Sequence, residues 1–155
     1  MGNLGTITDA CGGMFYDSQG PATNYLNNEF YTATFCAPPG QYITFDFTAF
    51  QTELLSDWLD IYNGPTTGSP LIGSYTGPFG PGTITSTLGG CITFVFTSDG
   101  NVRRPGWEAN ISCTTAPPST GNDCGTALPF CTGTSYTFPN NTNQPDLGPF
   151  DCLTS

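Results

Sequence analysis

The 155-residue sequence contains no histidine and no lysine, and its only cations are Arg103 and Arg104. Without histidine, the chain has no Ser-His-Asp or Cys-His catalytic group and no histidine ligand for zinc. Without lysine, it has no Schiff-base nucleophile and no phosphate-binding loop of the Walker type. Two catalytic carboxylates, as in a glycosidase, are the enzymatic possibility that remains. We expect a binding module and no enzyme.

Positively charged residues are scarce. The chain has 12 Asp and Glu residues against two arginines, which gives a formal net charge of −10 at pH 7. Nucleic acids and anionic membranes attract clustered Lys and Arg, so neither is an expected partner. No segment approaches the ~20 apolar residues of a membrane helix, which predicts no membrane insertion. The first six residues lack the basic start and apolar core of a signal peptide. They match an acylation pattern, but a Met-Gly left from cloning or from trimming a longer precursor explains them better.

Seven cysteines occur in this weakly charged chain. No two of them have Cys-x2-Cys spacing, so disulfides formed in an oxidising compartment explain them better than zinc does. The spacing favours Cys11–Cys36 and Cys91–Cys113, each closing a loop of roughly 20–25 residues. The odd count predicts either a partner cysteine outside this sequence or a free thiol. The sequence leaves open the pairing of Cys124, Cys131 and Cys152.

Apolar residues alternate with period 2, and a helical period is hard to find. Ile43 and Phe45 share one face of an expected strand, as do Leu59 and Ile61 in a later one. The expected strands cover residues 29–36, 41–47, 57–62, 83–86, 92–96 and 107–111. Gly- and Pro-rich turns separate them, which predicts an all-β antiparallel sandwich. We expect the last two strands to form a hairpin that Cys91–Cys113 closes.

The chain is expected to contain one complete domain and part of another region. Residues 1–114 carry the sandwich pattern, and the Pro-, Thr- and Ser-rich residues 115–121 resemble a linker. Residues 122–155 hold three cysteines and one clear strand, which is too little to bury a core. We interpret them as the start of a second Cys-containing β module or as a disulfide-pinned extension.

Three carboxylates, Glu53, Asp57 and Asp99, stand at the mouths of expected strands, next to turns rich in Gly and Asn. Calcium takes six to eight hard oxygen ligands at about 2.3–2.6 Å, supplied by carboxylates, backbone carbonyls and water. The three side chains therefore predict a calcium site. Asp60 is different, because it points away from the apolar face of its strand, and we interpret it as a solvated acid.

From Cys11 to Cys113 the chain resembles the CUB domain, the extracellular two-sheet module of complement proteases and many developmental proteins. The resemblance rests on several motifs in order, including a Pro-x-Gly turn before a strand, a Phe-x-x-Phe-x-x-Glu motif and a Phe-x-Ser-Asp motif. The matching segments are Ser18–Pro21, Asn24–Asn28, Ala37–Ile43, Phe47–Glu53, Asp57–Gly64, Phe94–Asp99 and Pro105–Trp107. Together these motifs imply a CUB-like sandwich of the jelly-roll type, stapled by disulfides and followed by a Cys-containing C-terminal extension.

The resemblance also implies how calcium would be held. Calcium-binding CUB domains hold the metal with a Glu, an Asp and a later Asp, and a Tyr orients these acids. The matching ligands here are Glu53, Asp57 and Asp99, oriented by Tyr25, and the backbone around Gly100 and Asn101 would complete the shell. In such domains a Lys or Arg of the partner protein can contact the same acids.

The cysteine pattern, together with the Cys-rich segment after residue 121, resembles CUB modules in large surface proteins of gliding Bacteroidota. Those proteins leave the cell by type IX secretion, so the resemblance implies an extracellular location on a bacterial cell surface. The function that we expect is calcium-dependent adhesion or protein interaction. The expected contacts are a basic protein surface and the adjacent modules of the same polypeptide.

Two other functions remain open. Trp58 and Tyr62 share the outward face of their strand and can stack on a sugar, which would make the chain a carbohydrate-binding module. The same two side chains can instead pack against the second sheet or a neighbouring module. In the last alternative, the domain is a structural spacer in a multi-module adhesin or fibre.

Overall fold

The computed structural model describes residues 2–115 of the chain. Residues 116–121 of the predicted linker and the whole predicted second region, residues 122–155, lie outside this part, as do Cys124, Cys131 and Cys152. None of the described residues belongs to a helix long and apolar enough to cross a membrane.

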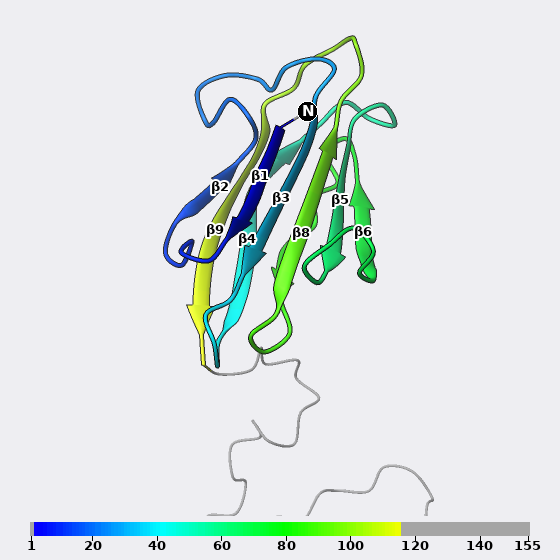
Figure 1. Ribbon diagram of the computed structural model, residues 1–155. Coiled ribbons are helices and arrows are strands. Elements are labelled where there is room, and N and C mark those ends of the chain that lie inside the picture. Colours follow the sequence, from blue (N-terminus) through cyan, green and yellow to red (C-terminus); the bar gives the residue numbers. More distant parts are fainter. Residues whose placement is uncertain (1, 116–155) are drawn as a thin grey trace, which may run out of the picture. The chain divides into compact units, whose positions relative to one another are not determined.

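Residues 2–115 form two β-sheets that face each other (Figure 1). One sheet has the strand order β1-β3-β8-β5-β6 and the other has the order β2-β9-β4-β7. The strands are β1 (Gly2–Ile7), β2 (Met14–Tyr16), β3 (Phe30–Cys36), β4 (Tyr42–Gln51), β5 (Trp58–Asn63), β6 (Leu71–Tyr75), β7 (Thr83–Thr85), β8 (Cys91–Thr97) and β9 (Gly106–Thr114). The expected all-β sandwich is confirmed, and its six expected strands correspond to β3, β4, β5, β7, β8 and β9.

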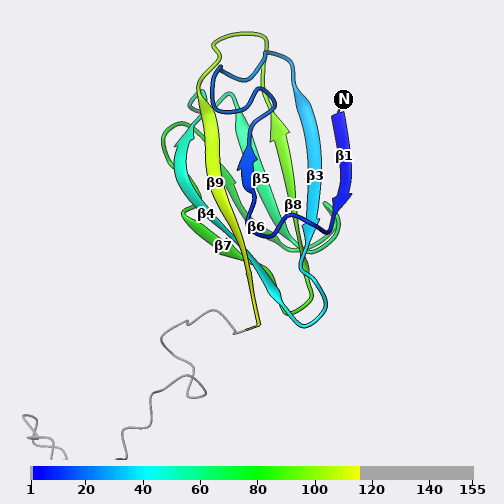
Figure 2. The same cartoon turned by 90° about the vertical axis from the view of Figure 1, so that its left-hand side faces the viewer.

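Three strands have no counterpart in the sequence prediction: β1, β2 and β6. β2 spans only three residues, and β1 and β6 contain glycine and lack a clean alternation of apolar and polar residues. β1 also pairs with β3 in parallel, so the sandwich is not purely antiparallel. Figure 2 shows β1 beside β3, at the edge of its sheet. Tertiary pairing forms these strands, and sequence periodicity does not reveal it.

The core lies between the sheets and includes most of the residues that the alternation predicted, together with others such as Phe15 of β2. Ile43, Phe45, Leu59, Ile61 and Ile92 are each 0% exposed. Burying a side chain of this size contributes about 1.5–3 kcal/mol relative to leaving it in water. An aromatic cluster fills the centre with mostly edge-to-face contacts, which suit the charge distribution of the rings. Its members are Phe15, Phe35, Phe45, Phe94, Phe96 and Trp107.

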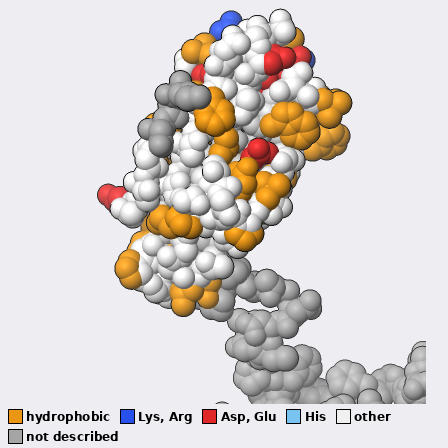
Figure 3. All heavy atoms as spheres, turned by 45° about the vertical axis from the view of Figure 1, so that its right-hand side comes forward, with side chains coloured by type: hydrophobic (Ala, Val, Ile, Leu, Met, Phe, Trp, Pro, Cys, Tyr) orange, Lys and Arg blue, Asp and Glu red, His pale blue; other side chains and the backbone are white. Residues whose placement is uncertain are grey.

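Some large hydrophobic side chains reach the surface. Figure 3 shows a group of them projecting close to acidic side chains near the upper end of the view. Leu54, Leu55 and Phe79 are 52%, 72% and 68% exposed. Leu54 and Leu55 belong to the turn between β4 and β5, which also carries Glu53. This turn is therefore both apolar and acidic.

The expected hairpin of the last two strands is wrong. β8 belongs to the first sheet and β9 to the second, so they face each other across the core. Phe96 and Trp107 do meet, with ring centroids 5.0 Å apart, but they pack between the sheets and are not cross-strand partners. Alternation of apolar and polar residues identifies which face of a strand is buried, but it does not identify the neighbouring strand in the sheet.

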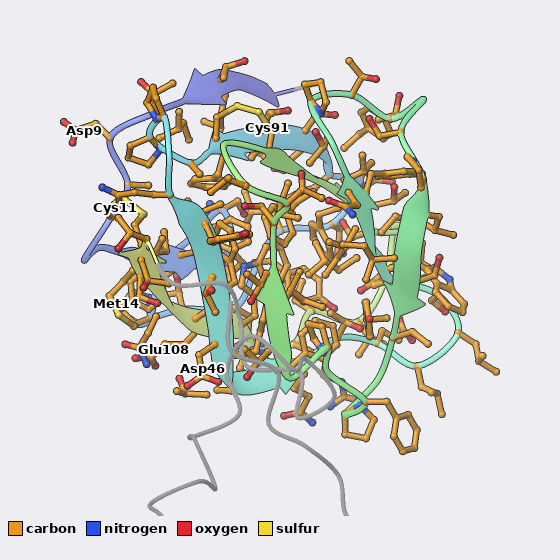
Figure 4. All side chains as sticks on the ribbon, turned by 90° about the horizontal axis from the view of Figure 1, so that it is seen from below. Asp9, Cys11, Met14, Asp46, Cys91 and Glu108 are labelled. Carbon is orange, nitrogen blue, oxygen red and sulfur yellow. A yellow bond between two sulfur atoms is a disulfide. The ribbon has the colours of Figure 1, made fainter. Side chains whose placement is uncertain are left out.

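Both expected disulfide pairings are wrong as well, although the same four cysteines are used. The bonds are Cys11–Cys113 and Cys36–Cys91. Cys36 and Cys91 are partners in the β3–β8 ladder, and Gly12 N–H donates a hydrogen bond to the Ile111 carbonyl, which brings Cys11 beside β9. Figure 4 shows the two bonds near the labelled Cys11 and Cys91. The cysteines are therefore paired according to which strands are neighbours, and not according to how short a loop each bond would close.

Candidate metal centre

The ends of β5 and β8 bring two acids together. Trp58, the first residue of β5, pairs with Thr97, the last residue of β8. Asp57 immediately precedes β5 and Asp99 follows β8, so the antiparallel ladder places both at one end of the sandwich. The Asp99 N–H donates a hydrogen bond of 2.9 Å to Asp57 Oδ1. The ladder and this bond fix the relative position of the two acids.

Glu53 joins them from the turn between β4 and β5. The Asp57 N–H donates to the Glu53 carbonyl at 3.1 Å, which folds residues 53–57 into a single turn. One carboxylate oxygen of each acid lies within 4.8 Å of those of the other two. Asp57 is fully buried, while Glu53 is half-buried. The structure therefore brings together the three acids that the sequence selected.

Tyr25 is fully buried and holds this arrangement from the core side. Its hydroxyl donates to Asp57 Oδ2 and accepts a hydrogen bond of 3.0 Å from the Glu53 N–H. Its ring packs edge-on against Phe96, with centroids 4.9 Å apart. Tyr25 thus connects two of the acids to the hydrophobic core, in the position that the family resemblance implied.

The loop after β8 carries the remaining expected ligands, Gly100 and Asn101. The Asn101 N–H donates to Asp99 Oδ1 at 2.8 Å, which orients this carboxylate. The Gly100 carbonyl accepts a hydrogen bond of 2.8 Å from Asn27 Nδ2. The Asn28 N–H donates to the Asp99 carbonyl at 2.7 Å. The loop is therefore ordered next to the acids, and the participation of Gly100 and Asn101 in a metal shell stays a prediction.

Two threonines that the sequence analysis missed support the turn that carries Glu53. The Thr76 hydroxyl donates to the Glu53 carbonyl at 3.0 Å and accepts a 2.8 Å hydrogen bond from the Leu55 N–H. The Thr52 hydroxyl donates to the Asp57 carbonyl at 3.2 Å. Thr76 lies more than 20 positions along the chain from Glu53. Only the folded chain brings its hydroxyl to this turn.

The electrostatics of the site favour a cation. Burial raises the pKa of the Glu53 carboxyl, and the charges of Asp99 and Asp57 raise it further, against a smaller opposing effect of Arg104. Burial also raises the pKa of the Tyr25 hydroxyl, helped by its hydrogen bond to Asp57. Glu53 Oε2 is buried and has no hydrogen-bond partner in the described structure. Clustered carboxylates with a free buried oxygen match the hard-oxygen donor set that calcium prefers.

The two aromatic residues proposed to contact a ligand lie on β5, and Trp58 directly follows Asp57 of the acidic cluster. Trp58 and Tyr62 are half-buried on β5, alternating with the fully buried Leu59 and Ile61. Asp60 lies between them and does not join the acidic cluster. Trp58 and Tyr62 therefore occupy the outward face that the alternation predicted. A role in binding sugars or neighbouring modules stays a prediction.

The family comparison agrees with the fold and with the motifs. A family model described as the CUB domain matches residues 5–111. The chain belongs to the CUB domain family. CUB domains are protein-interaction modules of extracellular proteins, typically without catalytic activity, and the two disulfides of this CUB domain suit an extracellular protein.

Solved structures of other proteins share this fold. The CUB1-EGF-CUB2 region of human MASP-1/3 matches with a TM-score of 0.61 at 18% identity, over 72% of this chain and 42% of that one. The MASP-1 CUB2 domain bound to Ca2+ matches with a TM-score of 0.58 at 21% identity, over 71% of this chain and 98% of that one. The full extracellular region of zebrafish Gpr126/Adgrg6 matches with a TM-score of 0.58 at 24% identity, over 70% of this chain but only 14% of that one.

Proposed function

We propose that this CUB domain is a calcium-dependent adhesion or protein-interaction module of a larger extracellular protein. The observation that carries the proposal is the convergence of Glu53, Asp57 and Asp99 within 4.8 Å at one end of the sandwich. These three acids repel one another, and a divalent cation would offset that repulsion. The similar MASP-1 CUB2 domain was solved bound to Ca2+, which supports calcium as the ion.

Partner binding is proposed at the same end of the domain. Glu53 and Asp99 remain partly accessible there, so a Lys or Arg side chain of a partner can approach these two acids. Next to Glu53, the exposed side chains of Leu54 and Leu55 offer apolar contact area. A negatively charged site bordered by apolar side chains suits a partner surface that presents a cation among hydrophobic residues. Calcium would order the site, and the chain's negative charge would steer a basic partner toward it.

The cellular context is proposed from the sequence resemblance. The cysteine pattern resembles CUB modules in type IX-secreted surface proteins of gliding Bacteroidota, which supports a location on a bacterial cell surface. In such a protein, adjacent modules would display the acidic end of the domain. Liquid chromatography–mass spectrometry of surface-shaved peptides from the source cells tests this location, and recovery of the chain only from the cytosolic fraction would contradict it.

Calcium binding is tested by a thermal melt of the chain in EDTA and in about 10 mM calcium, with native mass spectrometry to count ions. Extracellular modules bind calcium with a Kd of about 10⁻⁴–10⁻³ M. At this concentration the expected stabilisation is about 1.5–2.7 kcal/mol, or a Tm increase of roughly 5–15 °C. One bound ion is expected.

The matched variants are Asp99→Asn and Asp60→Asn, which remove the same charge inside and outside the cluster. Asp99→Asn should lose most of the calcium-induced shift, and Asp60→Asn should keep it. Equal shifts in both variants, or no bound ion in the unsubstituted chain, would reject the site. If calcium binds but partner affinity is the same in calcium and in EDTA, the site is structural and the calcium-dependent interaction is wrong.

A further inference from the structure

A second candidate site lies at the edge of the sandwich, between β2 and β3. A cavity of about 210 Å³ opens there between the two sheets. Figure 2 faces this edge, with β1 and β3 on one side and β9 on the other. Leu4 and Ser18 line the cavity and are exposed to solvent, so a small ligand can enter between them. None of the lining residues belongs to the acidic cluster of Glu53, Asp57 and Asp99.

Asp17 is the charged side chain that lines this cavity, and it is only 8% exposed. Its Oδ1 accepts a hydrogen bond of 2.8 Å from the Gln19 N–H. Its Oδ2 is buried without a hydrogen-bond partner among residues 2–115. Burial raises the pKa of the Asp17 carboxyl, and the charge of Glu29 raises this pKa further. Nearby backbone N–H groups act in the opposite direction, because they favour the charged form. The carboxylate is therefore poorly compensated.

Glu29 does not line the cavity, but it is a buried acid that hydrogen-bonds to the lining residue Ser18. It is 7% exposed, and its Oε1 accepts a hydrogen bond of 2.6 Å from the Ser18 hydroxyl. Its Oε2 is buried and has no hydrogen-bond partner within the described part of the chain. The only cations of the sequence, Arg103 and Arg104, are both exposed, and neither contributes to the pKa shift of Asp17. Burying an uncompensated charge costs several kcal/mol, so this site favours an incoming cation.

The rest of the lining is largely aromatic and apolar. Aromatic rings attract organic cations through the negative charge of their faces, and they also contact the alkyl part of such a ligand. The cavity is smaller than the ~300–1,000 Å³ of pockets for drug-sized ligands, which favours a slender molecule. The aromatic lining residues are Phe15, Tyr16, Tyr31, Phe94, Phe96 and Trp107.

We propose that this cavity binds a primary alkylammonium group, with Asp17 as its counter-ion and the surrounding rings in contact with its alkyl chain. A neutral sugar would leave the buried Asp17 carboxylate uncompensated, and an anion would be repelled by it. A primary ammonium offers N–H donors and a positive charge, and both suit the unpartnered Oδ2 of Asp17. The ammonium group comes either from a free amine or from the side chain of a lysine in another protein.

The test is an NMR titration of the ¹⁵N-labelled chain with n-butylammonium chloride, in saturating calcium. The neutral isostere 1-butanol is titrated in parallel. We expect saturable shifts of the amide signals of residues 15–18 and 33 with butylammonium, and at least about tenfold weaker binding of butanol. A second arm uses Nα-acetyl-lysine methylamide. Binding of this probe assigns the site to protein lysines, and binding of butylammonium alone assigns it to free amines.

The matched variants are Asp17→Asn and Asp60→Asn. Asp17→Asn keeps the acceptor for the Gln19 N–H and removes only the charge, so it should fold and bind butylammonium at least about tenfold more weakly. Asp60→Asn removes the same charge outside both the cavity and the acidic cluster and should leave this binding unchanged. Equal binding of butanol and butylammonium, unchanged binding in a folded Asp17→Asn variant, or shifts confined to residues 53–57 and 99 would each overturn the proposal. The comparison of butylammonium with butanol uses the unsubstituted chain, so it tests the proposal even if the Asp17→Asn variant does not fold.

Discussion

At the scale of single residues, one hydroxyl organises the acidic cluster. The Tyr25 hydroxyl donates to Asp57 and accepts from the Glu53 backbone, while its ring is fully buried. A buried carboxylate is costly unless hydrogen bonds satisfy it, and Asp57 receives one from Tyr25 and one from the Asp99 N–H. The same contacts that stabilise the fold therefore also prepare the acids for a cation.

The substitution Tyr25→Phe tests this dual role. It removes the hydroxyl while keeping the ring, and leaves Asp57 Oδ2 and the Glu53 N–H without their partner. We expect a loss of about 2–3 kcal/mol in the free energy of unfolding, measured with urea in EDTA. Calcium affinity, measured by calorimetry, should fall by about 10–100-fold, as when the supporting hydrogen bonds of metal ligands are removed.

Tyr42→Phe is the control for this measurement, because Tyr42 begins β4 at the opposite end of the strand from the acidic turn. It should change the unfolding free energy by less than about 0.5 kcal/mol and leave calcium affinity unchanged. If Tyr25→Phe loses stability but binds calcium as tightly as the unsubstituted chain, Tyr25 supports only the fold.

At the scale of elements, the β5–β8 ladder and the disulfides act at different places. The ladder ends where Asp57 and Asp99 meet, next to the pair of Trp58 and Thr97. The Cys36–Cys91 bond joins the other end of β8 to β3. The Cys11–Cys113 bond ties the segment before β2 to β9. The disulfides therefore constrain the sandwich without contacting the acids.

We expect removal of either disulfide to lower stability and to leave the calcium response intact. Closing loops with sequence separations of 102 and 55 residues is worth about 4.7 and about 4.2 kcal/mol in the chain-entropy model. Paired serine substitutions at Cys11 and Cys113, or at Cys36 and Cys91, should therefore each lower the urea midpoint strongly. The calcium-induced Tm shift of the folded fraction should persist.

The pairing itself is checked by digesting the chain without reductant and sequencing the linked peptides by mass spectrometry. Peptides that join Cys11 to Cys36, or Cys91 to Cys113, would contradict the observed connectivity. Loss of the calcium shift in a variant that still folds would show that the disulfides act on the acidic site.

At the scale of the whole molecule, negative charge dominates. The chain carries a formal net charge of −10 at pH 7, with a sequence pI near 4.1. Figure 3 shows acidic side chains near one end of the described domain, and both arginines follow Asp99 in the sequence. Such an excess of one sign favours solubility and attracts basic partners, but it also destabilises the compact state by self-repulsion.

This self-repulsion predicts that salt stabilises the calcium-free protein. Between about 10 mM and 500 mM NaCl the Debye length falls from about 30 Å to below 8 Å, so repulsion between surface acids is largely screened. We expect the Tm in EDTA to rise by several degrees, measured by differential scanning calorimetry. KCl should have the same effect, because screening does not depend on the identity of the ion. A Tm that falls or stays constant with salt would contradict this prediction.

The sequence by itself determined the strands with clear alternation, their buried faces and the identity of the three clustered acids. The strands and their buried faces are local features, because alternation with period 2 requires only neighbouring residues. The three acids were chosen instead from their places at strand ends and from the family motifs. The choice of Tyr25 came from the family motifs, and its buried hydroxyl between Glu53 and Asp57 agrees with that choice. In this part of the chain, the motifs and the physical contacts lead to the same residues.

Only the tertiary structure decided which strands are neighbours, and the disulfide pairing followed from that. Cys91 and Cys113 lie in different sheets, whereas Cys36 and Cys91 face each other in one ladder. The same holds for Asp17, whose buried and uncompensated oxygen became visible only when β2 and β3 enclosed a cavity. Burial and strand order depend on residues far apart in sequence, and no local pattern encodes them.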